Sequence, residues 1–164
     1  MSNWENYKKT MIQDKTIWSA AKENDIQFLK YAISNTNINA KDHRGYSALM
    51  LAAYSGSFEA AQFLLLNGAD PNTADFGGNT VLMGAAFKGD LEIVNLLVEH
   101  NAHIYLKNHS LMTALDYSIL FGRKNVELYL KNLTENQKTL NRLFLFLKFI
   151  RQILNQALHS NKGV

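Results

Sequence analysis

The segment DHRGYSALMLAAYSG at residues 42–56 recurs 33 positions later as DFGGNTVLMGAAFKG at residues 75–89. The two copies share a glycine in the opening turn, a hydroxyl residue before a helix, a Leu-Met pair, an Ala-Ala pair and a closing glycine. The leucine-rich segments that follow, around Leu64 and Leu97, are displaced by the same interval. A fixed period of this length predicts a solenoid of stacked units rather than a single globular core.

Each period predicts two short helices. Ser47 precedes an alanine-rich segment, and its hydroxyl is placed to cap the helix that this segment forms. Gly56 ends that helix, and 58–66 follows as a second helix with apolar residues at helical spacing. Gly68 supplies the positive φ that is favoured just past a helix C-terminus. Two helices this short cannot bury their apolar faces alone, so each unit needs neighbours.

The pattern resembles the ankyrin repeat. The family's T-P-L-H tetrapeptide is matched in part by SALM at 47–50, TVLM at 80–83 and TALD at 113–116, which lack its proline and its histidine. The Ala-Ala-x-x-Gly segments and LLNGAD at 65–70 match well. The resemblance implies an all-α solenoid without catalytic activity that binds partner proteins through its inner helices and hairpin tips.

We therefore predict an all-α ankyrin-repeat solenoid of about four helix-turn-helix repeats with short hairpin loops. The predicted segments are an N-terminal cap at 1–15, a repeat domain at 16–132 with repeats at about 16–41, 42–74, 75–107 and 108–132, and a C-terminal apolar capping helix at 133–160. The first repeat has Asn24 at a glycine position, and asparagine tolerates the left-handed conformation. The fourth has Leu111 where Gly45 and Gly78 stand, and a leucine with positive φ costs about 1 kcal/mol, so we expect a reshaped turn there.

The C-terminal helix carries apolar residues at heptad spacing and is nearly apolar all round between Leu143 and Ile150. We expect it to cover the open end of the fourth repeat; a second copy of the chain, a membrane surface and a partner protein are the alternatives. The residues expected to make this contact are Leu140, Leu143, Phe144, Leu147, Ile150 and Leu154. Basic residues far outnumber acidic ones from Phe121 onward, so the alternative function is a peripheral membrane-binding or self-assembling protein that acts through this helix.

Composition and motifs exclude several classes of protein and of site. The chain of 164 residues suits one domain, and its lack of cysteine excludes disulfides, thiolate metal sites and cysteine nucleophiles. Its basic residues are spread out and no nucleic-acid motif accompanies them, so no nucleic acid is expected. His100, His103 and His109 lack companions at ligand spacing. We expect no metal, no cofactor and no enzyme activity.

The resemblance places a protein-binding surface at the hairpin tips and at the ends of the inner helices. The residues at these positions include His43, Arg44, Tyr46, Tyr54, Phe76, Asn79, Phe87, Lys88, His109 and Met112. Aromatic and arginine side chains are what binding hot spots favour. The alternative is that Tyr54 and Phe87 merely stack on each other and that Leu120 and Phe121 lie under the last helix. We expect a cytoplasmic monomer with a protein partner that the sequence does not name. The expected location includes the cytoplasm of a host cell into which a bacterial protein is delivered.

Overall fold

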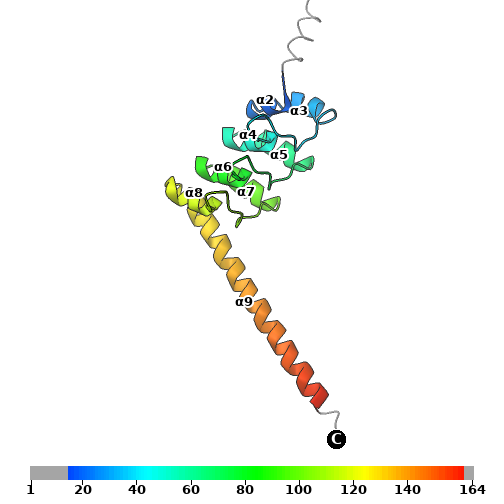
Figure 1. The fold of residues 1–164 in the computed structure, drawn as a ribbon, viewed down its shortest axis with the longest axis vertical. Coiled ribbons are helices and arrows are strands. Elements are labelled where there is room, and N and C mark those ends of the chain that lie inside the picture. The colour runs from blue at the N-terminus through cyan, green and yellow to red at the C-terminus, as the bar shows by residue number, and fades with distance from the viewer. Residues whose placement is uncertain (1–14, 161–164) are drawn as a thin grey trace, which may run out of the picture. The chain divides into compact units, whose positions relative to one another are not determined.

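The computed structural model describes the backbone of residues 15–160 and the side chains of residues 15–152. Its helices, labelled as in Figure 1, are α2 (Ile17–Lys22), α3 (Ile26–Ala32), α4 (Ala48–Ser55), α5 (Phe58–Leu66), α6 (Val81–Lys88), α7 (Leu91–Glu99), α8 (Ala114–Leu120) and α9 (Lys124–Ser160). The predicted N-terminal cap at 1–15 lies outside the described residues except for Lys15. The all-α prediction is confirmed.

The repeat domain is a stack of helix pairs joined by hairpin loops (Figure 1). Helices α2, α4, α6 and α8 contact one another in that order, and α3, α5 and α7 do the same. The Ala-Ala pairs at 52–53 and 85–86 are almost completely buried, as are Ala20 and Ala21 in α2. Because alanine has only a methyl side chain, successive inner helices approach closely. Leucines such as Leu49, Leu64, Leu82 and Leu97 fill the core behind them.

The hairpin loop is built the same way in three repeats. The side-chain Oδ1 of Asp42 accepts hydrogen bonds from the backbone N–H groups of Arg44 and Tyr46, both at 2.9 Å. Asp75 and Asn108 accept from the equivalent N–H groups at 2.8 to 3.0 Å. The hydroxyl groups of Ser47, Thr80 and Thr113 then accept from the N–H group three residues on, as predicted for helix caps.

The turn of the fourth repeat keeps its shape, so the expected reshaping at Leu111 is wrong. Leu111 has a φ of 62°, against 86° at Gly45 and 76° at Gly78. Glycine is required in the earlier turns for a second reason: a Cβ at Gly45 would lie 3.0 Å from the ring of Phe76, and one at Gly78 would lie 3.0 Å from the ring of His109. The side chain of Leu111 is 73% exposed, so a leucine fits there at the cost of the strained φ alone.

The predicted boundary between the fourth repeat and a separate C-terminal helix is corrected. A single helix, α9, runs through residues 131–133 without a break and is 37 residues long. Residues 124–160 contain no glycine or proline to end the helix. The compact units are residues 1–127 and 128–164, and the capping role assigned to the second unit stays a prediction. In the described part of the chain, no helix has an apolar stretch of the length needed to cross a membrane.

Candidate interaction groove

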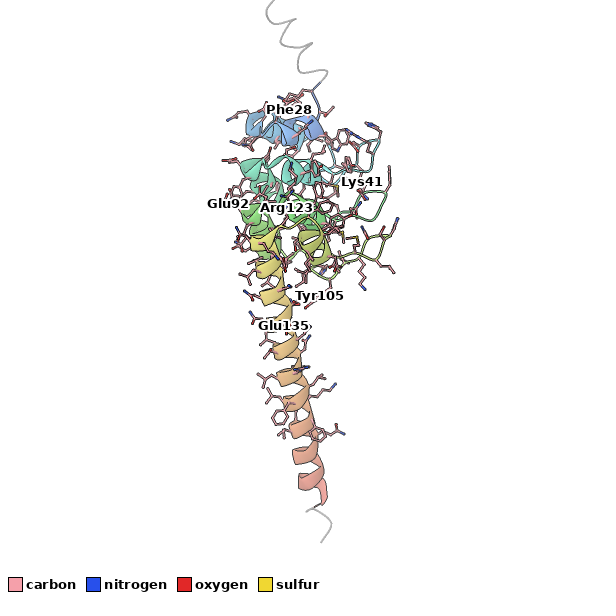
Figure 2. The ribbon with its side chains drawn as sticks, turned by 90° about the vertical axis from the view of Figure 1, so that its left-hand side faces the viewer. Phe28, Lys41, Glu92, Tyr105, Arg123 and Glu135 are labelled. Atoms are coloured by element: carbon pink, nitrogen blue, oxygen red, sulfur yellow. The ribbon has the colours of Figure 1, made fainter. Side chains whose placement is uncertain are left out.

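A concave groove of about 930 Å³ runs along the inner helices and hairpins of the repeat domain. It brings together predicted site residues from the second and third repeats. These are His43, Arg44, Tyr46, Tyr54, Asn79 and Phe87. Figure 2 shows Lys41, which also lines the groove, on the side from which the loops project, and Glu92 on the opposite side.

Aromatic rings form a row along this surface. The rings of Tyr54 and Phe87, from adjacent repeats, stack with centroids 5.9 Å apart and an interplanar angle of 6°. Phe121 meets Phe87 edge to face at 4.5 Å and lies 6.0 Å from Tyr117. The stacking considered as an alternative is therefore present, yet Tyr54 remains 47% exposed and Phe121 42% exposed. The row supports itself through ring contacts while presenting ring surface to solvent.

Cationic side chains lie over two of the groove's tyrosines. The ammonium of Lys88 is 5.1 Å from the ring centroid of Tyr54, and the guanidinium of Arg44 is 5.5 Å from that of Tyr46. Cation–π contact at such distances holds the charge against the ring face without neutralising it. Lys88 thereby joins the aromatic row, although it is not among the residues that line the groove itself.

The acidic groups of the groove are engaged with their own loops. Burial raises the pKa of the Asp42 carboxyl, but the N–H groups of Tyr46 and Arg44 and the nearby charges of His43 and Arg44 outweigh it, so this pKa lies below its ordinary value. Asp75 accepts from two backbone N–H groups and from the amide of Asn79. The cations Lys22, Lys41 and Arg44 line the groove: the ammonium of Lys41 donates to the carbonyl of Ala74 at 2.6 Å, and the guanidinium of Arg44 lies 3.8 Å from the carboxylate of Asp42. Three lysine and arginine side chains against two aspartates give the lining of the groove a small net positive charge.

Asn79 is held inside a hydrogen-bond network. Its Oδ1 accepts from the amide of Asn108 at 2.7 Å and from the hydroxyl of Tyr117 at 2.8 Å. Its Nδ2 donates to Asp75 at 3.0 Å. This network links the hairpin of the third repeat to the fourth repeat, so the Asn79 side chain has a structural role.

Three other predicted residues lie outside the groove. The ring of Phe76 packs over Gly45 and is 68% exposed, and the ring of His109 packs over Gly78 in the same manner. His109 also donates its backbone N–H to the carbonyl of Gly77 at 3.0 Å. Met112 is half-buried. Phe76 and His109 thus connect successive hairpin tips.

The structure adds groove residues that the sequence analysis omitted. Trp18, Leu51, Gly84 and Tyr117 all line the groove, and they stand 33 residues apart. Lys22, which stands 33 residues before Ser55, lines the groove as well. The period could have found them, because the same face of each inner helix points to the groove in every repeat. Trp18 is anchored by a hydrogen bond from its Nε1 to the carbonyl of Ala40 at 3.1 Å.

The residues predicted to make contact through the C-terminal helix are exposed along α9. These are Leu140, Leu143, Phe144, Leu147 and Ile150; the side chain of Leu154 lies outside the described residues. Among the residues that the structure describes, no three histidine or carboxylate side chains gather as metal ligands would.

Stacked helix pairs, a concave groove on one side and hairpin loops linked by side-chain hydrogen bonds define a helical repeat protein. Comparison with known families agrees: models described as "Ankyrin repeats (3 copies)" and "Ankyrin repeats (many copies)" match residues 7–75 and 67–118. The chain belongs to the ankyrin repeat family. Ankyrin repeats generally serve as protein–protein interaction modules and generally lack catalytic activity.

Similar proteins are ankyrin repeat proteins from distant organisms. An ankyrin repeat-containing protein of Treponema pallidum is 41% identical over 81 residues, which is 49% of this chain and 27% of that protein. Ankyrin repeat domain-containing protein 29 of Danio rerio is 34% identical over 67 residues, 40% of this chain and 22% of its own length. The mitochondrial disaggregase of Homo sapiens is 38% identical over 66 residues, 40% of this chain and 9% of its own length. The matches therefore span about a quarter or less of each relative.

Proposed function

We propose that this chain is a non-catalytic interaction module that holds a partner protein in the groove defined above. The observation that carries the proposal is the combination of exposed stacked rings with cationic side chains along one concave face. Tyrosine, tryptophan and arginine contribute most to binding energy when a partner desolvates them, and here Tyr54, Trp18 and Arg44 lie on that face. The module acts as a monomer.

The charge of the groove favours an acidic partner segment. Lys22 and Lys41 offer positive charge, and Arg44 lies 3.8 Å from Asp42 with its side chain 63% exposed, whereas the carboxylates of Asp42 and Asp75 accept hydrogen bonds from the hairpin backbone. An extended segment with aromatic and acidic side chains would stack on Tyr54 and pair with these cations. Complementary charge of this kind speeds association and makes it dependent on salt.

The experiment has two steps. The full-length protein captures partners from a native lysate, and the strongest partner is purified and titrated against wild type, Tyr54→Ala and Arg44→Ala. Gln62→Ala and Glu92→Ala serve as matched controls on exposed positions of α5 and α7 that do not line the groove. Weaker binding by the groove variants alone supports the proposal. Equal affinity of all five proteins, each shown to be folded, would place the functional surface elsewhere.

A further inference from the structure

The second compact unit carries an unusual density of large apolar side chains that nothing within that unit covers. Every residue from Leu143 to Ile150 except Lys148 is a leucine, isoleucine or phenylalanine, and each is exposed along α9. Taken by itself, this part of the chain is a single helix. The apolar surface therefore has to be covered by something that is not part of the unit.

The charge of the same segment has one sign. From residue 136 to residue 164 the sequence contains no aspartate or glutamate. Lys138, Arg142, Lys148 and Arg151 recur along the described part of this span. Lys138 reaches back to Glu135 at 2.8 Å, an exposed pair that holds little energy. Whatever covers the segment has to accept its positive charge.

The two kinds of side chain divide around the helix. With about 100° per residue, Leu140, Leu143, Phe146, Leu147 and Ile150 fall within an arc of about 120°. Lys138, Arg142 and Lys148 fall within a second arc of about 120° nearly opposite the first. Arg151 borders the apolar arc, where a long side chain can lie along an apolar surface with its charge in water. Leu145 and Phe149 lie on the basic side and Phe144 beside it, which extends the apolar surface beyond one arc.

A second copy of the chain fits this distribution poorly. In a coiled coil with Leu140, Leu143, Leu147 and Ile150 in the seam, specificity comes from opposite charges that flank it. The charged flanking residue in this span is Arg151, and residues 136–164 offer no carboxylate to pair with it. Neither a parallel nor an antiparallel pair of these segments gives Arg151 a carboxylate partner within residues 136–164.

We propose that residues 138–152 of α9 bind an anionic lipid surface, with the Leu140–Leu143–Phe146–Leu147–Ile150 arc turned toward the acyl chains. A bilayer surface offers an apolar layer and negative charge side by side, which is the combination that this segment needs. Because cations recur along the segment, the helix lies along the surface rather than entering end-on. Each lysine or arginine close to such a surface is attracted by the negative charge of the lipid headgroups.

Flotation of the full-length protein with vesicles tests the proposal directly. Vesicles of phosphatidylcholine with about 30% phosphatidylserine are compared with pure phosphatidylcholine. We expect co-flotation with the anionic vesicles only, and a loss of binding as NaCl rises from about 0.05 to 0.5 M, because salt screens the attraction. Replacement of Lys138, Arg142, Lys148 and Arg151 by glutamine should weaken partition at least about tenfold.

A matched pair of double variants tests the orientation of the helix. Phe146→Ala with Leu147→Ala removes one phenylalanine and one leucine from the apolar arc, whereas Phe149→Ala with Leu145→Ala removes the same two side chains from the basic side. The first variant should lose clearly more binding than the second. Tyr54→Ala, which changes the groove alone, should float like wild type, so this test is independent of the proposed function.

Three results would overturn the proposal. The first is equal flotation with neutral and anionic vesicles, or none with either. The second is an oligomer that wild type forms in sedimentation without lipid and that the Phe146→Ala/Leu147→Ala variant does not form, which would identify a second copy as the covering surface. The third is a lower melting temperature of the repeats in that variant without lipid binding by wild type, which would identify the repeats themselves as the covering surface.

Discussion

The side chain of Asn24, in the first repeat, caps a helix of the second: its Oδ1 accepts a hydrogen bond from the backbone N–H of Ala60 at 2.8 Å. The Nδ2 of the same amide donates to the carboxylate of Glu59 at 2.7 Å. Ser57, which precedes helix α5, makes no capping bond of its own, and its hydroxyl donates instead to the carbonyl of Lys22 at 3.0 Å. The first two repeats are thus joined by reciprocal polar contacts across their interface.

Asn24→Ala should destabilise the protein by about 1 to 2 kcal/mol, because it removes a helix cap and places a Cβ-only residue at a φ of 59°. Asn24→Gly keeps the positive φ and loses only the cap, so it should cost less, about 1 kcal/mol. Urea denaturation followed by circular dichroism measures both. Gln62→Ala, which shortens an exposed amide on α5, is the control and should change little. Equal losses for alanine and glycine would show that the conformation at residue 24 carries no strain.

Leu111→Gly should stabilise the protein by about 0.5 to 1 kcal/mol, because glycine relieves the left-handed strain at a φ of 62° and the exposed leucine buries little. Leu111→Ala keeps the strain and should give no gain, which makes it the matched control. Thermal unfolding of the three proteins distinguishes them. A less stable glycine variant would mean that the leucine side chain contributes packing in the folded protein.

Asp42→Asn should change how stability depends on pH. Asn108 occupies the equivalent position and accepts the same two backbone hydrogen bonds, so the turn should survive. The pKa of Asp42 is lowered in the folded protein, so its contribution is present above the unfolded pKa and is lost as the pH falls through the folded value. At pH about 7 the variant should be roughly 1 kcal/mol less stable than wild type, since a charged acceptor binds N–H groups more strongly. The difference should shrink below pH about 4. Urea midpoints measured across this range check it, and a constant difference would contradict it.

Tyr54→Ala and Arg44→Ala should each weaken binding of the purified partner by at least about 1 kcal/mol, roughly fivefold in Kd. Phe87→Ala should weaken binding too, but this residue is half-buried, stacks on Tyr54 and meets Phe121 edge to face, so its substitution also lowers stability. Isothermal titration with each variant, alongside its melting temperature, separates lost contact from lost structure. Raising the salt concentration should weaken wild type more than Arg44→Ala.

The resemblance of the sequence to a family correctly predicted an all-α ankyrin-repeat solenoid, and local chemistry predicted the hydroxyl caps of its inner helices. The 33-residue period, the hydroxyl residues at 47, 80 and 113 and the buried alanine pairs follow from interactions within one repeat or with an identical neighbour. The period also marks Trp18, Leu51, Gly84 and Tyr117 as members of one face. Such features recur in phase, so a single chain displays them several times.

The tertiary structure decided what does not repeat. At Leu111 the turn keeps its φ because its side chain is exposed, whereas the glycines before it face the rings of Phe76 and His109. Asn79 is drawn into a network with Asn108 and Tyr117 that no local pattern announces. A sequence period reveals the positions that neighbouring repeats share, while steric room and hydrogen-bond partners at each position depend on which side chains the stacked repeats bring together in space.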